Sequence, residues 1–277
     1  LDLLKQALEL EEQRKPALAD AAVREFRLRS GSPLLLLHEG QLLELRGRLE
    51  SARDRYMTCV EENARAGRLE PAKQALWAVG LVSVLLGDAA PALAFARRQV
   101  MEGEEHLVLS FLEAAQGDLA GAERSLQRYG AALPWLSPSA LDCERARNEA
   151  MAALLRNDEQ AVKIAAERLR NVYEFNSYLR FLRARIALKA KEYPAADRYF
   201  RRVLYYFRDR GGISASRYSA PALALLSRFY LGQLYEVTGK REQAVSEYKH
   251  FLSRCEGSPS RLPQIAEARA ALKRLGL

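Results

Sequence analysis

The sequence predicts an all-α protein in which antiparallel helix pairs stack side by side into a solenoid. Three observations support this fold class. No segment shows the alternating apolar and polar pattern of a strand. Turn residues recur along the 277-residue chain, and similar small and large side chains return at fixed distances from each turn. Hydrophobic residues make up 49% of the chain, which is enough to bury a continuous core.

The repeat is defined by six turn positions separated by 40, 30, 39, 35 and 48 residues: Gly47, Gly87, Gly117, Arg156, Lys191 and Gly239. Seven residues before each turn the side chain is small in five of six cases: Gly40, Gly80, Ser110, Glu149, Ala184 and Gly232. Five residues after each turn there is always an alanine: Ala52, Ala92, Ala122, Ala161, Ala196 and Ala244. Nine residues after each turn stand Tyr56, Ala96, Leu126, Ala165, Phe200 and Tyr248.

Helix packing explains this pattern. Two antiparallel helices approach closely only where a small side chain on one faces a larger one on the other. Glycine suits the turn because a helix usually ends with a residue at positive φ. An aspartate follows three of the turns, at positions 88, 118 and 158, where it can cap the next helix.

The clearest unit is the last, Leu231-Gly232-x-x-Tyr235 followed by Ala244-x-x-x-Tyr248. It resembles the tetratricopeptide repeat family, and the resemblance covers residues 34–254. It implies a right-handed superhelix of about six helix pairs. Residues 1–30 should add two helices separated at Pro16, and 262–277 should form a capping helix, giving 14 to 15 helices. Residues 211–224 should be an insertion, either a loop or an extension of the following helix.

A narrower resemblance involves the run that begins YFRRVL and ends AEARAAL. It is similar to the C-terminal end of tetratricopeptide regions in modular bacterial signalling proteins, which carry a serine/threonine kinase or a winged-helix domain. The resemblance implies a sensing or partner-binding region, with an effector domain before Leu1 and the chain as a fragment of a longer protein. We expect a cytoplasmic location, although a position beyond a removed membrane span stays open. No apolar run here reaches the roughly 20 residues of a membrane span.

No group of residues predicts catalysis. His38, His106 and His250 have no second ligand at a metal-binding spacing, and Cys143 has no nearby histidine to act as a base. Phosphate loops and nucleophile elbows are missing. We therefore expect no catalytic residue, metal or cofactor, and a protein that is not an enzyme. The three cysteines lie too far apart in a solenoid to form a disulfide.

The resemblance places the first helix of each unit on a concave surface. The candidate groove residues for a protein or peptide partner are Trp77, Leu81, Phe111, Tyr178, Phe181, Arg185, Phe229 and Gln233. In the fourth unit the same placement gives Ala146, Ala150 and Ala153. The positions that grip a carboxylate in chaperone-binding relatives hold Leu, Gln, Trp and Phe, so that mode is not expected. Two interpretations remain open: a hydrophobic or amphipathic helix binds in the groove, or tight superhelical curvature or the chain's own terminal helices cover it.

The net charge of +8 comes from one segment. Residues 168–210 hold twelve Lys and Arg against four Asp and Glu, together with ten of the 23 aromatic residues. This pattern favours an acidic or phosphorylated protein partner, with Arg180, Arg183, Arg185, Arg201 and Arg202 as candidate contacts whose guanidinium groups should reach solvent. Nucleic acid is a less favoured partner, and self-association is also open. The alternative is a solvated face whose arginines pair with acids while the aromatics pack between helices.

Overall fold

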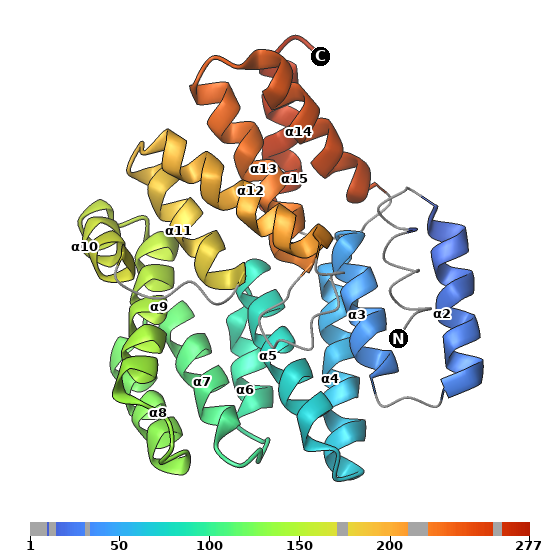
Figure 1. Cartoon of the computed structure of the whole chain (residues 1–277), viewed down its shortest axis with the longest axis vertical. Coiled ribbons are helices and arrows are strands. Elements are labelled where there is room, and N and C mark those ends of the chain that lie inside the picture. The colour runs from blue at the N-terminus through green and yellow to red at the C-terminus, as the bar shows by residue number, and fades with distance from the viewer. Residues whose placement is uncertain (1–9, 11–14, 31–33, 171–176, 210–220, 257–261) are drawn as a thin grey trace.

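Helices account for the regular structure of this protein (Figure 1). The computed structural model describes residues 10, 15–30, 34–170, 177–209, 221–256 and 262–277. Within these residues no strand occurs, which confirms the all-α prediction. The helices are α2 (Pro16–Ser30), α3 (Leu35–Leu45), α4 (Leu49–Arg65), α5 (Leu69–Leu85), α6 (Ala89–Ala96), α7 (Glu104–Ala115), α8 (Leu119–Ala132), α9 (Pro138–Arg156), α10 (Glu159–Arg170), α11 (Ser177–Lys189), α12 (Tyr193–Asp209), α13 (Pro221–Val237), α14 (Arg241–Arg254) and α15 (Pro263–Arg274).

Neighbouring helices form antiparallel pairs. Helix α3 packs on α4, α7 on α8, α11 on α12 and α13 on α14, and the same pairing joins α5 with α6 and α9 with α10. The first helices of successive pairs also touch, from α3 through α5, α7, α9 and α11 to α13, and Figure 1 shows them along a continuous arc. Helix α2 packs on α3 at one end, and α15 packs on α14 at the other. The fold is therefore a tetratricopeptide-type α-solenoid.

Five of the six predicted turn residues have a left-handed backbone. Gly47, Gly87, Gly117, Lys191 and Gly239 have φ between 62° and 85°. This conformation lets the chain reverse while the last carbonyls of the helix stay hydrogen-bonded. After α7, for example, the Asp118 N–H donates to the Glu113 carbonyl at 3.0 Å. The Asp118 side chain then caps α8 by accepting from the Gly121 N–H at 2.8 Å.

The predicted register of the fourth unit was wrong by one residue. Arg156 is the last residue of α9, and the left-handed turn residue is Asn157, with φ of 54°. The small residue of this unit is therefore Ala150, which is fully buried, instead of Glu149. On α10 the core position is held by buried Val162, while Ala161 is half-buried. Asparagine tolerates the left-handed region better than most side chains, so it replaces glycine at this turn.

Corrected in this way, the six units all carry a small buried residue at the same place: Gly40, Gly80, Ser110, Ala150, Ala184 and Gly232. In the first and last units it allows a tyrosine to pack directly on the backbone. A Cβ at Gly232 would lie 2.7 Å from Cδ1 of Tyr248, and a Cβ at Gly40 would overlap the Tyr56 ring. Each glycine thus sets how closely its two helices approach.

The array closes on itself. Helix α13 of the sixth unit packs against α3 of the first, although they are far apart in sequence. The Ala222 N–H donates to Oε2 of Glu44 at 2.9 Å, and the Tyr56 hydroxyl donates to Oε1 of the same side chain. Beside them, a Cβ at Gly47 would lie 2.8 Å from Sγ of Cys255, at the end of α14. We call this contact between the first and sixth units the seam.

The expectations for residues 1–30 and for the insertion at 211–224 fall partly outside the described residues. Helix α2 begins at Pro16, while residues 1–9 and 11–14 lie outside them. Residues 221–224 belong to α13, and the remainder of the proposed insertion, 211–220, also lies outside the described residues.

Candidate functional site

The inner wall of the array is formed by three positions on the first helix of each unit. They lie three residues before, one residue after and four residues after the small residue. In the first four units all of these side chains are buried: Leu37, Gln41, Glu44, Trp77, Leu81, Val84, Leu107, Phe111, Ala114, Arg147, Met151 and Leu154. In the last two units four of the six are only partly buried: Arg185, Leu188, Gln233 and Glu236. The inner wall is therefore buried over the first four units and partly exposed over the last two.

An aromatic cluster fills the middle of the inner wall. The ring centroids of Trp77 and Phe111 are 5.0 Å apart, and those of Phe111 and Tyr178 are 5.5 Å apart. The guanidinium of Arg147 lies 4.6 Å from the centre of the Trp77 ring and forms an ion pair with Glu144. Arg147 is only 2% exposed, so its charge is balanced by the carboxylate and the aromatic faces.

Sequence reasoning missed Arg147 because of the register error in the fourth unit. Reading three residues back from Glu149 gave Ala146, whereas reading back from Ala150 gives Arg147. The signal that could have found it was Asn157, the left-handed residue between two helical segments.

The predicted groove residues divide into two groups. Trp77, Leu81, Phe111, Tyr178 and Phe181 are all buried in the core. Phe229 is buried as well, but it lines an open cavity together with the partly exposed Arg185 and Gln233.

This cavity, the C-terminal cleft, has a volume of about 740 Å³. It lies between α11, α13 and α15, and parts of α12 and α14 complete it. Its lining residues are Arg185, Leu188, Lys189, Lys191, Tyr193, Phe229, Tyr230, Gln233, Glu236, Val237, Tyr248, Glu267, Ala270 and Arg274. A cleft of this size falls in the range of about 300–1,000 Å³ that is usual for ligand sites.

The two sides of the C-terminal cleft differ in charge. Arg185, Lys189 and Lys191 stand on and after α11, whereas Glu236 and Glu267 stand on α13 and α15. The guanidinium of Arg185 lies 4.1 Å from the centre of the Tyr230 ring, which orients it along the wall.

Glu236 joins α13, α14 and α15 at the base of the acidic side. Its carboxylate pairs with Arg274 at 3.0 Å and accepts a hydrogen bond from the Tyr248 hydroxyl at 2.8 Å. Burial and the neighbouring carboxylate raise the pKa of Tyr248 well above its ordinary value, so this hydroxyl remains a donor. Gln233 reaches Glu267 of α15 at 3.4 Å. These contacts connect the helices that form the acidic side of the cleft.

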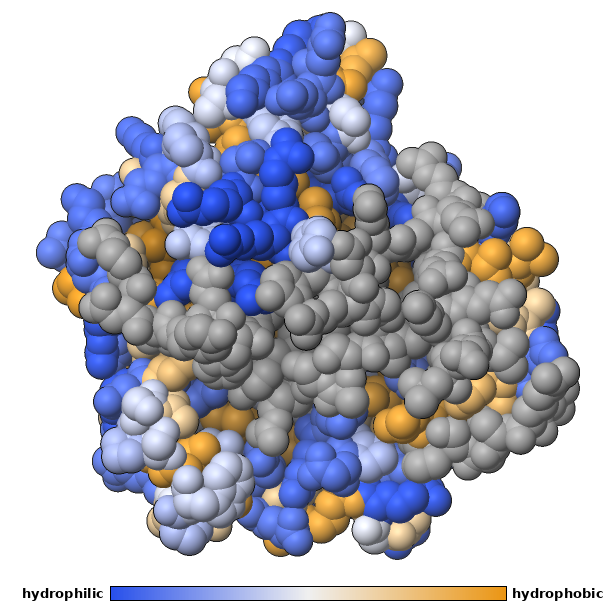
Figure 2. Space-filling model, in the orientation of Figure 1, coloured by the Kyte–Doolittle hydropathy of each residue, from blue (hydrophilic) through white to orange (hydrophobic). Residues whose placement is uncertain are grey.

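The predicted basic patch is divided between the interior and the surface. Arg180 and Arg183 on α11 are buried, and Arg183 donates to the Leu169 carbonyl. The expectation that these guanidinium groups reach solvent is therefore wrong for this pair. Arg201 and Arg202 on α12 are exposed, and Figure 2 shows strongly hydrophilic residues over α11 and α12 on the face viewed.

Arg201 is held by a local network. It forms an ion pair with Asp197 at 2.9 Å and donates to the Tyr235 hydroxyl at 2.5 Å. Burial alone would lower the pKa of Arg201, but Asp197 and Tyr235 outweigh it and raise that pKa. Burial and the hydrogen bond to Asp197 also raise the pKa of Tyr235 to about 12.

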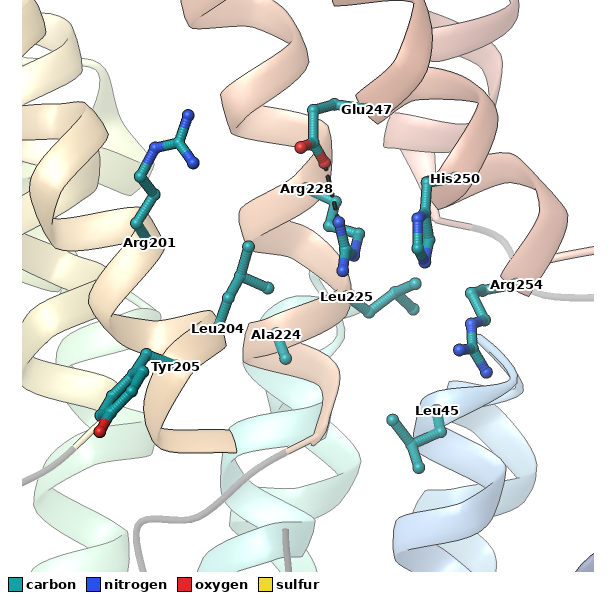
Figure 3. Close-up of a pocket in the computed structure, with 10 residues that line it drawn as sticks. All are labelled: Leu45, Arg201, Leu204, Tyr205, Ala224, Leu225, Arg228, Glu247, His250 and Arg254. Carbon is teal, nitrogen blue, oxygen red and sulfur yellow. Dashed lines mark hydrogen bonds and ion pairs between the residues drawn. The ribbon is translucent and has the colours of Figure 1, made fainter. Parts of the chain in front are cut away.

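A second cavity, the seam pocket, lies on another face of α13 (Figure 3). Its volume is about 410 Å³, and it shares no residue with the C-terminal cleft. Its lining residues are Leu45, Arg201, Leu204, Tyr205, Ala224, Leu225, Arg228, Glu247, His250 and Arg254.

The described residues offer little covalent or metal chemistry. Burial raises the pKa of the Cys59 and Cys143 thiols to about 11 and of the Cys255 thiol to about 12, so they stay protonated. Among the described residues, no three His, Cys, Asp or Glu side chains gather as metal ligands. Within the same ranges, no helix combines the length and apolar character needed to cross a bilayer.

No protein-family model matches the chain, and no curated protein is similar to it at a significant level. Among solved structures, the crystal structure of a tetratricopeptide repeat protein from Parabacteroides merdae is similar to it. The alignment covers the whole of this chain and 98% of that one, with 14% sequence identity and a TM-score of 0.44.

Proposed function

We propose that this protein is a binding module without catalytic activity of its own, which holds a segment of a partner protein in the C-terminal cleft. The observation that carries the proposal is the change along the inner wall. Its side chains are buried in the first four units, but Arg185, Leu188, Gln233 and Glu236 are partly exposed in the last two. A preformed cleft lined by rigid helices costs little ordering energy when it binds.

The lining indicates the chemistry of the bound segment. Leu188 and Val237 offer apolar surface, and Val237 is 60% exposed. Arg185, Lys189 and Lys191 line the side formed by α11. We infer that the segment inserts an apolar side chain between α11 and α15 and directs acidic or phosphorylated groups toward α11, as in helix-in-groove and acidic-motif recognition.

The exposed arginines of α12 extend this charge. Arg202 is exposed beside Arg201, so an acidic partner would be steered toward this end of the molecule. A nucleic-acid function has less support, because Arg180 and Arg183 are buried and the exposed basic surface is small. The resemblance of the C-terminal units to modular bacterial signalling proteins favours a regulatory, cytoplasmic setting for the module.

The test is a peptide selection on the full chain. A random peptide library is displayed on phage and selected on the immobilised protein, and the selected peptides are measured by fluorescence anisotropy. We expect sequences with an apolar anchor flanked by acidic residues, whose affinity falls as salt is raised.

A matched pair of variants locates the binding site. Val237→Glu places a charge at the cleft, and Val100→Glu makes the same change at an 84% exposed position between α6 and α7. We expect Val237→Glu to weaken binding about tenfold or more, the equivalent of about 1.4 kcal/mol, and Val100→Glu to leave it unchanged. Equal binding by both variants, or selected peptides without acidic residues, would contradict the proposal.

A further inference from the structure

The seam pocket joins parts of the chain that are distant in sequence. Leu45 comes from the end of α3 in the first unit, and the other lining residues come from α12, α13 and α14 in the fifth and sixth units. Any molecule that fills this pocket therefore contacts both sides of the seam.

The pocket has an apolar part and a cationic part. Leu45, Leu204, Ala224 and Leu225 supply the apolar surface, and Tyr205 stands at the edge with 61% of its surface exposed. Three arginines line the cavity with one carboxylate, that of Glu247, and Arg201 is also paired with Asp197 outside the lining. The lining thus carries a positive charge next to an apolar wall.

The cationic groups are placed by their neighbours. Glu247 pairs with Arg228 at 3.1 Å, and Figure 3 shows Arg228, His250 and Arg254 reaching down on the same side of the pocket, toward the level of Leu225 and Leu45. A guanidinium has five N–H donors in a fixed fork, so Arg228 keeps donors for a second acceptor while it holds Glu247. Carboxylate and phosphate groups match this fork best.

We propose that the seam pocket binds a small organic anion, a phosphate monoester or carboxylate that carries an apolar group, and that this ligand stabilises the closed array. The anionic group lies against Arg228 and Arg254, and the apolar group lies against Leu204 and Leu225. An inorganic ion would leave the apolar wall uncovered, and a neutral apolar molecule would make no use of the charged N–H donors that line the pocket. A volume of about 410 Å³ accommodates a ligand of this kind.

Closure and binding are linked in this arrangement. Because the pocket is complete only when Leu45 of α3 meets α13 and α14, the ligand binds the closed form and raises its stability. This inference does not depend on the C-terminal cleft, since the two cavities share no residue.

Phenyl phosphate and benzoate are suitable probes. Inorganic phosphate, which has the anionic group alone, and benzyl alcohol, which has an uncharged ring, are the controls. Isothermal titration at constant ionic strength measures binding, and the thermal midpoint measures stabilisation. We expect saturable binding of phenyl phosphate or benzoate and a higher thermal midpoint. Inorganic phosphate and benzyl alcohol should each bind more weakly by about tenfold or more. Whether phenyl phosphate or benzoate binds more tightly shows whether the pocket prefers a phosphate or a carboxylate group.

Two arginine variants and one control complete the test. Arg228→Gln and Arg254→Gln should each lower the affinity for the tighter-binding probe about tenfold or more, because each removes a charged hydrogen-bond donor. Arg198→Gln removes the same charge from an exposed position of α12 outside the pocket, and should change affinity less than about twofold. Circular dichroism confirms that the variants remain folded. Titrations that never saturate, or equal affinity in Arg254→Gln and Arg198→Gln, would overturn the proposal.

Discussion

At the scale of single residues, the distance between paired helices depends on glycines, which have no side chain. Gly232 faces the ring of Tyr248, and the Tyr248 hydroxyl is fixed by its hydrogen bond to Glu236. The same arrangement joins Gly40, Tyr56 and Glu44 in the first unit. Because each ring is anchored at its far end, it has little freedom to move away from a larger neighbour.

Replacing Gly232 by alanine should therefore destabilise the protein, although alanine favours helices by about 1 kcal/mol. The new Cβ would lie 2.7 Å from two ring carbons of Tyr248, and overpacking of this kind costs about 1–3 kcal/mol. Urea unfolding measures the difference. Gly80→Ala is the matched control, because its nearest neighbour is a single methyl of Val108 at 3.0 Å, and it should lose less. A Gly232→Ala protein as stable as the wild type would show that Tyr248 can move aside.

At the scale of helices, one side chain connects three of them. Glu44 on α3 accepts hydrogen bonds from Tyr56 of α4 and from the Ala222 N–H of α13, and only 1% of its surface is exposed. Burial raises the pKa of this carboxyl to about 7, against the hydrogen bonds from Tyr56 and Ala222, which lower it. The folded protein thus holds a proton that the unfolded chain releases near pH 4.5.

The pH dependence of stability follows from this proton. The contribution of the protonated carboxyl is complete below about pH 4.5 and is lost as the pH rises through about 7. The free energy of unfolding, measured as wild type minus Glu44→Gln, should fall by on the order of 3 kcal/mol between these limits. The subtraction removes shared titrations such as that of His38, whose pKa is lowered by burial. A difference that stays flat across this range would mean that Glu44 is not protonated in the fold.

The helices themselves could be predicted from the sequence, because they depend on local turn chemistry and on the spacing of small residues. Where both signals agreed, as at Gly117 and Ala122, the turn and the buried alanine were correctly placed. In the fourth unit, aligning Ala161 with the alanines of the other units placed the turn one residue too early. The turn residue is Asn157. Because of this error of one residue, Arg147 was not predicted to lie on the inner wall.

At the scale of the whole molecule, the sequence could not predict which part of the inner wall is open. The repeats specify how each pair packs on the next, but closure depends on small rotations that add up over six units. The contact of α13 with α3 is the sum of these rotations. It brings together Glu44 and Ala222, two residues that no local pattern relates. Both cavities depend on the last two units, and the seam pocket exists only if the array closes.

An engineered disulfide can test whether the first and sixth units meet. A Cβ at Gly47 would lie 3.4 Å from Cβ of Cys255, close to the roughly 3.5–4.5 Å of a disulfide. Gly67→Cys is the control, because this glycine has a similar φ of 68° but no atom within 4 Å of the Cβ position. Under mild oxidation, intact-mass and peptide mapping should show a link between positions 47 and 255 in Gly47→Cys, and none from position 67 in Gly67→Cys. If the folded Gly47→Cys protein kept both thiols free under these conditions, the first and sixth units would not meet, and the closed array would be wrong.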